Sequence, residues 1–316
     1  MEGLVFGASP RFRVFMELVE SYASTDWPVL ILGETGVGKE LIARYIHRLS
    51  SRASHPLLTL NASALPPQLF ESELFGYEKG AFSGAMTSKP GLFRAAHRGT
   101  LLLDEIGDMD PGLQSKLLRT LESGEVRSVG STRTDHVDVR VIASTNADLF
   151  QAVSSGAFRH DVLERISVLR LEVPPLSDRP EDIPLIANHL CQTQRLSITP
   201  EALQLLKDYD WPGNVRQLRN VLVRAGAMSR NQISSLQIDQ LVIEERRRFP
   251  KAVHADRDVS RLTLADIERQ FIESKIRLCQ GNKKLAAKEL GISKSTLFEK
   301  IRKYKEEDTS SQLFAH

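Results

Sequence analysis

The chain has 316 residues, 41% of them hydrophobic, and a formal net charge of +2 at pH 7. This length allows two domains with buried cores, and a charge so close to zero does not by itself mark a nucleic-acid binder. No apolar run reaches the length of a membrane span, and the N-terminus lacks the basic head and apolar core of a signal peptide, so we expect a cytoplasmic protein. The two cysteines, Cys191 and Cys279, lie far apart inside helical patterns, which argues against a disulfide framework.

Short apolar runs alternate with helix-like stretches in the first half of the chain. The runs are WPVLIL, PLLTL, GTLLLDE, VDVRVIAST and SVLRLEV. Buried strands separated by longer helical segments are typical of a parallel sheet covered by helices on both faces. We therefore expect an α/β fold over residues 1–176.

The chain changes character after this part. Residues 177–243 contain a series of helical segments and predict an all-helical subdomain. Residues 244–261 are charged, include a proline and have no clear period, which predicts a linker. A last helical unit is expected over 262–307, followed by a disordered tail over 308–316.

A glycine-rich loop, GETGVGKE, follows the first apolar run and precedes the helix-like ELIARYIHRL. It satisfies GxxxxGK in the strand, loop and helix context that the motif needs, so a plain glycine-rich turn is the weaker alternative. Such a loop wraps backbone N–H groups around phosphate oxygens, and its lysine reaches the outer phosphates. Glu40 stands where a Ser or Thr usually binds Mg²⁺, so the metal has to depend on other groups. The predicted nucleotide-binding residues are Gly33, Glu34, Thr35, Gly36, Val37, Gly38, Lys39 and Glu40.

Polar residues end three of the predicted strands. Asp104 and Glu105 end GTLLLDE, where one acid can hold Mg²⁺ and the other can deprotonate the attacking water. With the loop, these acids predict nucleotide hydrolysis and make Asp104 the candidate metal ligand. Asn61 and Asn146 end two other strands, where open α/β sheets place their ligands, but each also fits an ordinary strand-end cap.

The C-terminal unit contains two short helical patterns separated by Gly291-Ile292-Ser293. Glycine at the turn, Ser293 as a cap and an apolar interior of Ala286, Leu290, Ile292, Leu297 and Ile301 indicate a helix-turn-helix. Its second helix would enter the major groove, and the local excess of basic residues would bind phosphates. A solvated pair of charged helices is the alternative. The predicted DNA contacts are Lys294, Ser295, Thr296, Glu299, Lys300 and Lys303.

Nearly the whole chain resembles one family, the AAA+ ATPases that activate sigma-54 RNA polymerase, called bacterial enhancer-binding proteins. The matching blocks, in order, are GETGVGKELIARYIH, LTLNASALPPQLFESELFGYEKGAFSGA, GTLLLDEIGDM, SGEVRSVGS, VRVIASTN, FRHDVLERI, RPEDIPLIA and WPGNVRQLRNVLVRA. The resemblance implies a P-loop sheet with a helical lid, ATP and Mg²⁺ as the nucleotide and metal, and a C-terminal Fis-type domain. Glu40 is itself usual in this family.

The resemblance also implies roles around the nucleotide. Asn146 would report the γ-phosphate, and Asn61 would hold Glu105 off or on the attacking water. Arg159 and Arg165 match the two arginines that reach the ATP of a neighbouring subunit, although without the family they would be taken for surface ion-pair formers.

Two further matches lie in the lid. Arg216 would be its ATP-sensing arginine, and Gln217 replaces the acid that is more usual at the next position. An arginine supplied in trans implies a hexameric ring, and the helix ahead of the helix-turn-helix would support dimerisation.

The family's sigma-54 contact loop, GAFTGA, is present here as GAFSGA. Its rise with bound ATP would press Phe82 on the sigma factor and convert the closed promoter complex to the open one. Ser83 stands where the family has threonine. The loop residues are Gly80, Ala81, Phe82, Ser83, Gly84 and Ala85.

Three readings remain at this point. The first is an ATP-driven activator that binds upstream promoter DNA and remodels the sigma-54 holoenzyme. The second is an AAA+ DNA-binding regulator that does not engage sigma-54, and the third is an AAA+ machine on another substrate, which leaves the loop and the terminal domain unexplained. Because the ATPase pattern begins close to Met1, the sequence also leaves open a stand-alone activator restrained by a separate protein and a piece of a longer regulator.

Overall fold

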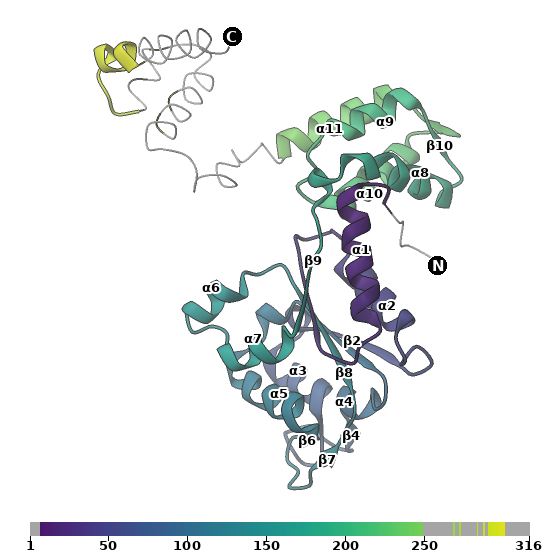
Figure 1. The fold of residues 1–316 in the computed structure, drawn as a ribbon, viewed down its shortest axis with the longest axis vertical. Coiled ribbons are helices and arrows are strands. Elements are labelled where there is room, and N and C mark those ends of the chain that lie inside the picture. The colour runs from purple at the N-terminus through teal and green to yellow at the C-terminus, as the bar shows by residue number, and fades with distance from the viewer. Residues whose placement is uncertain are drawn as a thin grey trace. The chain divides into compact units, whose positions relative to one another are not determined.

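The structure is a computed structural model that describes residues 7–248 and, further along, residues 268, 272, 283, 287 and 290–300 (Figure 1). The chain divides into two compact units, Met1–Arg248 and Phe249–His316, and each is considered by itself.

The first unit is built on a sheet of five parallel strands in the order β2-β5-β8-β1-β9 (Figure 1). The five apolar runs of the sequence form these strands, so the predicted α/β fold is confirmed. Asn61 pairs with Asp104, which pairs with Ser144, so the polar strand ends lie side by side at the carboxyl edge of the sheet. The strands are β1 (Val29–Leu32), β2 (Leu57–Asn61), β5 (Thr100–Asp104), β8 (Arg140–Thr145) and β9 (Leu169–Glu172).

Helices cover both faces of this sheet. Side chains alternate between the faces of a strand, so Leu101 and Leu103 pack on one side, with Phe70 and Leu163, while Leu102 packs on the other, with Phe15. Both cores are buried, as expected for parallel strands. The helices are α1 (Pro10–Ala23), α2 (Lys39–Leu49), α3 (Pro67–Phe75), α4 (Leu92–Ala95), α5 (Pro111–Ser123), α6 (Leu149–Ser154) and α7 (His160–Ile166).

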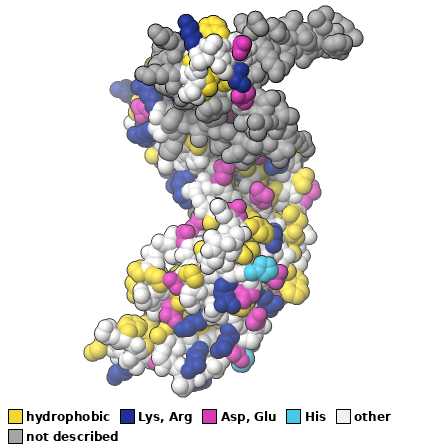
Figure 2. All heavy atoms as spheres, turned by 90° about the vertical axis from the view of Figure 1, so that its left-hand side faces the viewer, with side chains coloured by type: hydrophobic (Ala, Val, Ile, Leu, Met, Phe, Trp, Pro, Cys, Tyr) yellow, Lys and Arg dark blue, Asp and Glu magenta, His cyan; other side chains and the backbone are white. Residues whose placement is uncertain are grey.

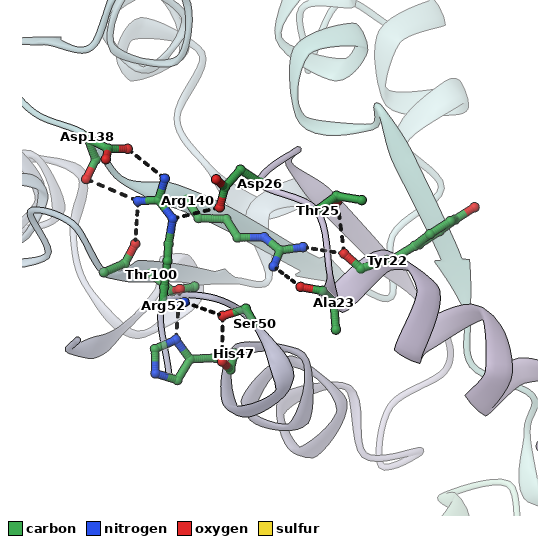
Figure 3. A network of polar contacts seen from close by, with 11 residues as sticks. Tyr22, Ala23, Thr25, Asp26, His47, Ser50, Arg52, Thr100, Asp138 and Arg140 are labelled. Atoms are coloured by element: carbon green, nitrogen blue, oxygen red, sulfur yellow. Dashed lines mark hydrogen bonds and ion pairs between the residues drawn. The ribbon is translucent and has the colours of Figure 1, made fainter. Parts of the chain in front are cut away.

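A buried arginine bonds the amino edge of the sheet to the end of helix α1 (Figure 3). Arg140, at the start of β8, donates to the carbonyl oxygen of Ala23 at 3.0 Å and to that of Tyr22 at 2.8 Å. These carbonyls end α1, where the helix dipole favours a cation. Burial lowers the pKa of Arg140 to about 10, so the guanidinium remains charged at neutral pH. Arg52 lies beside it and binds Asp26.

The first turn of α1 is bonded to the segment that leads into the helical part. Asp182, which is fully buried, accepts the backbone N–H of Ser9 at 2.8 Å and its hydroxyl at 3.1 Å. Ser9 also caps α1 through the backbone N–H of Phe12. A β-carbon on Gly7 would lie 2.1 Å from the Asp182 carboxylate, so no larger residue fits there without a shift.

The helical part has its own core, centred on Trp211, Leu218 and Leu222. It contains the predicted helices and a short pair of parallel strands that was not predicted, β10 (Ser197–Ile198) and β11 (Gln232–Ile233). The helices are α8 (Ile183–Thr193), α9 (Pro200–Lys207), α10 (Asn214–Ala227) and α11 (Ser235–Arg248).

The predicted start of the linker at residue 244 is wrong, because α11 continues to Arg248. Its charged end stays helical since Leu241, Val242 and Glu245 are buried on one face. The rest of the predicted linker, most of the unit over 262–307 and the predicted tail over 308–316 lie outside the described residues.

Two short hairpins project from the α/β part, and one of them carries the GAFSGA loop. Strands β3 (Gly76–Tyr77) and β4 (Lys89–Pro90) form the base of that loop. Strands β6 (Glu125–Val126) and β7 (Asp135–His136) form the other hairpin. Short 3-10 turns occupy Ala62–Ala64, Ile106–Asp108, Leu176–Asp178 and Pro180–Asp182.

The second unit contains the predicted turn and cap. Gly291 has a φ of +68°, and Ser293 Oγ accepts the backbone N–H of Thr296 at 3.1 Å, at the start of the helical residues 294–300. Leu297 is fully buried with Ile272 and Ala287. Ala286 and Ile301 of the predicted interior lie outside the described residues.

On the face drawn in Figure 2, Lys and Arg side chains are interspersed with Asp and Glu. This mixture agrees with the small net charge of +2. Among the described helices, none combines the length and apolar character that crossing a bilayer requires.

Candidate active site

The glycine-rich loop joins β1 to α2, as its sequence predicts. Gly36 has a φ of +83°, and a β-carbon there would lie 2.4 Å from the carbonyl oxygen of Gly213, so only glycine fits. Lys39 begins α2 and is buried, with Nζ donating to the carbonyl oxygen of Gly33 at 3.0 Å. The ammonium group therefore lies over the inside of the loop, where phosphate oxygens would be held.

The two acids at the carboxyl end of β5 take different positions. Asp104 accepts a hydrogen bond from Ser144 Oγ at 2.7 Å. Glu105 has a φ of +51°, which is uncommon for a residue with a side chain and is typical of functional sites. Its carboxylate lies 3.5 Å from Lys39 Nζ and accepts the backbone N–H of Asn146 at 3.2 Å. Glu105 thus faces the phosphate-binding loop, while Asp104 stays bonded to the strand ends.

The two asparagines lie at this edge, but one has a different partner from the one expected. Asn146 Nδ2 donates to Thr35 Oγ1 at 3.0 Å and so connects β8 to the loop. Asn61 Nδ2 donates to Asp104 at 3.0 Å and not to Glu105. The register of β2 on β5 places Asn61 directly beside Asp104, while the left-handed backbone of Glu105 carries its carboxylate away.

A cavity of about 900 Å³ opens between the loop and the helical part. Its lining combines polar side chains of the α/β part, Lys39, Asp104 and Glu105, with apolar side chains of the helical part such as Ile186 and Val215. This volume and mixed lining suit a small-molecule site, and a nucleotide needs polar contacts for its phosphates and apolar contacts for its base. The other lining residues are Phe12, Thr35, Gly36, Val37, Gly38, Glu40, Leu41, Ile42, Arg179, His189, Leu190, Thr193, Arg216, Arg219 and Asn220.

The helical part supplies arginines to this cavity. Arg216 lines it from α10, and its backbone N–H donates to the carbonyl oxygen of Gly36 at 3.3 Å. Arg219 also lines the cavity, and sequence reasoning missed it. The signal was available, because residues three apart lie on the same face of a helix.

Family models match the chain in three consecutive parts. Residues 5–172 match the Sigma-54 interaction domain, residues 177–255 the AAA+ ATPase lid domain, and residues 263–304 the Bacterial regulatory protein, Fis family. The chain belongs to the family of sigma-54-dependent activators. The resemblance found in the sequence is therefore confirmed, as are an ATP-binding AAA+ domain and a Fis-type DNA-binding domain.

Individual relatives agree with this family. The chain is 41% identical over 309 residues to the transcriptional regulatory protein ZraR of Salmonella typhimurium, covering 94% of this chain and 68% of ZraR. It is 48% identical over 238 residues to the anaerobic nitric oxide reductase transcription regulator NorR of Aeromonas salmonicida, covering 73% of this chain and 47% of NorR. The crystal structure of NtrX from Brucella abortus in complex with ATP has a TM-score of 0.69 at 32% identity, covering 95% of this chain and 69% of that one.

The two arginines expected to act in trans do not line the cavity of their own chain. Arg159 is exposed and donates to the Asp161 carboxylate at 2.7 Å, and this hydrogen bond to Asp161 raises the pKa of its guanidinium. Arg165 donates from Nε to the carbonyl oxygen of Leu121 at 3.0 Å. Neither arginine completes the site within one chain.

The GAFSGA segment forms a compact turn on its hairpin. The backbone N–H of Gly80 donates to the carbonyl oxygen of Ala85 at 2.9 Å, and Ala85 is buried. Phe82 is 45% exposed, with its ring centroid 5.0 Å from that of Tyr77. Met86, which sequence reasoning did not single out, is 80% exposed. Two large apolar side chains therefore reach solvent at this loop.

The predicted DNA contacts fall into two groups. Lys294, Ser295 and Glu299 are exposed. Thr296 Oγ1 lies 2.8 Å from Ser293 Oγ, and Lys300 Nζ binds the carboxylate of Glu268 at 2.8 Å, so both are engaged within their own unit. Lys303 lies outside the described residues.

Gln217, which stands in the lid where relatives more often have an acid, does not line the cavity. It is buried, accepts the backbone N–H of Gly213 at 2.9 Å and donates to Glu245 at 2.6 Å. Glu245 is also buried and binds Arg224 at 3.1 Å. An uncharged donor at position 217 therefore suits this chain, because a carboxylate already occupies the facing position.

We expect Gln217→Glu to destabilise the helical part. Two buried carboxylates would face each other, and the two arginines close by, Arg224 and Arg248, already pair with Glu245. The substitution should therefore cost about 2 kcal/mol and lower the Tm by about 4–8 °C. Gln217→Met, which removes the hydrogen bonds without adding charge, is the matched control and should cost less. Thermal unfolding followed by circular dichroism measures both variants, and a Gln217→Glu protein as stable as the wild type would contradict the expectation.

Proposed function

We propose that the chain is an ATP-hydrolysing activator that binds upstream promoter DNA and converts sigma-54 RNA polymerase from the closed to the open promoter complex. The observation that carries this proposal is the exposed Phe82, on a loop projecting from the domain that contains the nucleotide cavity. An exposed apolar loop of this kind marks a protein contact. The terminal helix-turn-helix supplies the DNA-binding part.

In the proposed reaction, ATP binds with its phosphates against the loop amides and Lys39. Glu105 is the general base, because its carboxylate faces the loop and can accept the proton of the attacking water. Asn146 contacts both Thr35 and the Glu105 carboxylate, so a γ-phosphate between them would displace these bonds. That displacement would make Asn146 the residue that reports nucleotide state.

The oxygen donors beside the phosphate position fit Mg²⁺, which proteins often hold through one or two carboxylates together with substrate phosphates. Asp104 would hold the metal, with the hydroxyl of Ser144 fixing the orientation of its carboxylate. When bound, Mg²⁺ neutralises charge developing on the phosphates.

A direct chain segment connects this site to the contact loop. Asn61 bonds Asp104, and the residues after it form the turn Ala62–Ala64 and then α3, which ends at Phe75 next to the hairpin. A change in the bonds of Asn61 on hydrolysis would move α3 and raise or retract the loop. The working form in this proposal is a hexameric ring, with Arg159 and Arg165 reaching the neighbouring site.

A second candidate function is an AAA+ DNA-binding regulator that does not engage sigma-54. The observation that favours it is Ser83, which lacks the methyl of the family's threonine. Transcription in vitro from a sigma-54 promoter with ATP separates the two, because absence of open complex despite ATPase activity and DNA binding would support the second function.

We expect Phe82→Ala to lower open-complex formation by about 30-fold or more, the loss typical of truncating a central aromatic contact, while ATPase activity persists. Ser83→Thr should raise it by about fourfold, because one more methyl is buried against the sigma factor. Permanganate footprinting of the promoter measures both. Trp27→Ala, also an exposed aromatic but outside the loop, is the control. If Ser83→Thr has no effect while Phe82→Ala abolishes the complex, the ring alone carries the contact.

A further inference from the structure

An aromatic side chain lies exposed on the second helix of the helix-turn-helix. Phe298 is 44% exposed, although its neighbour Leu297 is fully buried in the core of this unit. A single exposed apolar side chain is ordinary on a protein surface, so the position and neighbours of the ring have to show what it contacts. Phe298 is not among the DNA contacts predicted from the sequence.

The position of Phe298 on the helix places it on the open side. With Leu297 turned to the core, the exposed residues Lys294, Ser295, Phe298 and Glu299 form one continuous face of residues 294–300. This is the face that a recognition helix presents to the major groove.

Two ammonium groups flank the ring. Lys283 Nζ, from an earlier helical residue, lies 5.1 Å from the ring centroid, and Lys294 Nζ lies 5.8 Å from it. Both distances are within cation–π range. The apolar ring therefore lies between two cations. A polyanion that also carries an apolar group fits this arrangement better than an apolar protein surface does.

The major groove offers one such group, the C5-methyl of thymine, which accepts apolar contacts from side chains. We propose that Phe298 reads a thymine methyl in the DNA site, with Lys283 and Lys294 binding phosphates beside it. The proposal rests on DNA binding by this unit as part of the proposed function. It adds a specificity-determining contact, because lysine–phosphate contacts alone carry no sequence information.

The test uses the full chain and synthetic DNA. The wild-type protein first selects its site from a library of random duplexes, and each thymine of the selected site is then replaced singly by deoxyuridine, which lacks only the methyl. The wild type should lose about fourfold in affinity at one or more thymines, the effect of about one buried methyl. In Phe298→Ala the loss at those thymines should disappear, while Phe298→Leu should keep part of it.

Two results would overturn the proposal. One is that the wild type shows no sensitivity to deoxyuridine, and the other is that Phe298→Ala shows the same sensitivity as the wild type. If that second result comes with weakened self-association of Phe298→Ala in sedimentation, the ring belongs to a contact between copies. Failure of the wild type to select any sequence would instead remove the DNA-binding part of the proposed function. Binding of both variants to random duplex DNA, with the same salt dependence as the wild type, shows that the unit is folded.

Discussion

Replacing Glu105 with glutamine should lower the rate of ATP hydrolysis by about 10²- to 10⁴-fold, the contribution typical of a positioned general base. The amide has nearly the shape of the carboxylate but cannot accept the proton of the attacking water. ATP binding should persist or tighten, because the substitution removes a negative charge that lies 3.5 Å from Lys39 Nζ. Phosphate release measures the rate, and binding of a fluorescent ATP analogue measures the affinity.

The matched control is Asp108→Asn. Asp108 follows closely in the chain, is exposed and does not line the cavity, so its charge should not matter for hydrolysis. A Glu105→Gln protein that hydrolyses ATP at the wild-type rate would remove Glu105 from the role of base. Loss of ATP binding in that variant would show that Glu105 serves the fold of the loop instead.

Arg159→Ala and Arg165→Ala should each lower ATP hydrolysis by about 10³- to 10⁵-fold if these arginines stabilise the transition state from a neighbouring subunit. Both lie away from the cavity of their own chain, so ATP affinity of the isolated subunit should hardly change. Arg133→Ala, at another exposed arginine, should be silent. The measurement is the hydrolysis rate at a protein concentration that saturates ring assembly.

A mixture of two inactive variants tests the assignment in trans. In rings of Arg159→Ala and Glu105→Gln subunits mixed at random, an Arg159→Ala subunit keeps Glu105 and borrows Arg159 from a Glu105→Gln neighbour. Half of the sites belong to Arg159→Ala subunits, and about half of these have a Glu105→Gln neighbour. About a quarter of all sites then have both groups and should recover activity. No recovery in rings shown to contain both variants would place Arg159 in its own subunit's site or outside the reaction.

Much of the sheet and of its polar edge could be predicted from the sequence. Apolar runs of strand length located the strands, and their carboxyl ends place Asn61, Asp104 and Asn146 at one edge whatever the side-chain rotamers are. The choice of Asp104 over Glu105 as the partner of Asn61 could not be predicted, because it depends on the left-handed backbone of Glu105. That conformation results from the turn after β5, and neither the amino-acid composition nor the spacing of apolar residues indicates it.

The lid was harder to predict because its polar contacts join distant positions. The charged residues 244–248 have the composition of a linker, yet they end α11, where buried Glu245 meets Arg224 and Gln217 from α10. The sequence shows each residue but not that they meet. Arg216 could be assigned only by its resemblance to a family motif, since one arginine in a helix has no distinguishing spacing.

The bond between Ser9 and Asp182 limits how the molecule can change shape. Both oxygens of a fully buried carboxylate are occupied by one residue at the start of α1. If the lid swings as a rigid body, the first turn of α1 must travel with it, or a buried charge loses its hydrogen-bond donors at considerable cost. The strand β8 is tied to the other end of the same helix through Arg140. Helix α1 therefore connects the segment that leads into the lid with strand β8, which directly precedes Asn146, and a displacement at one end of the helix should shift the other.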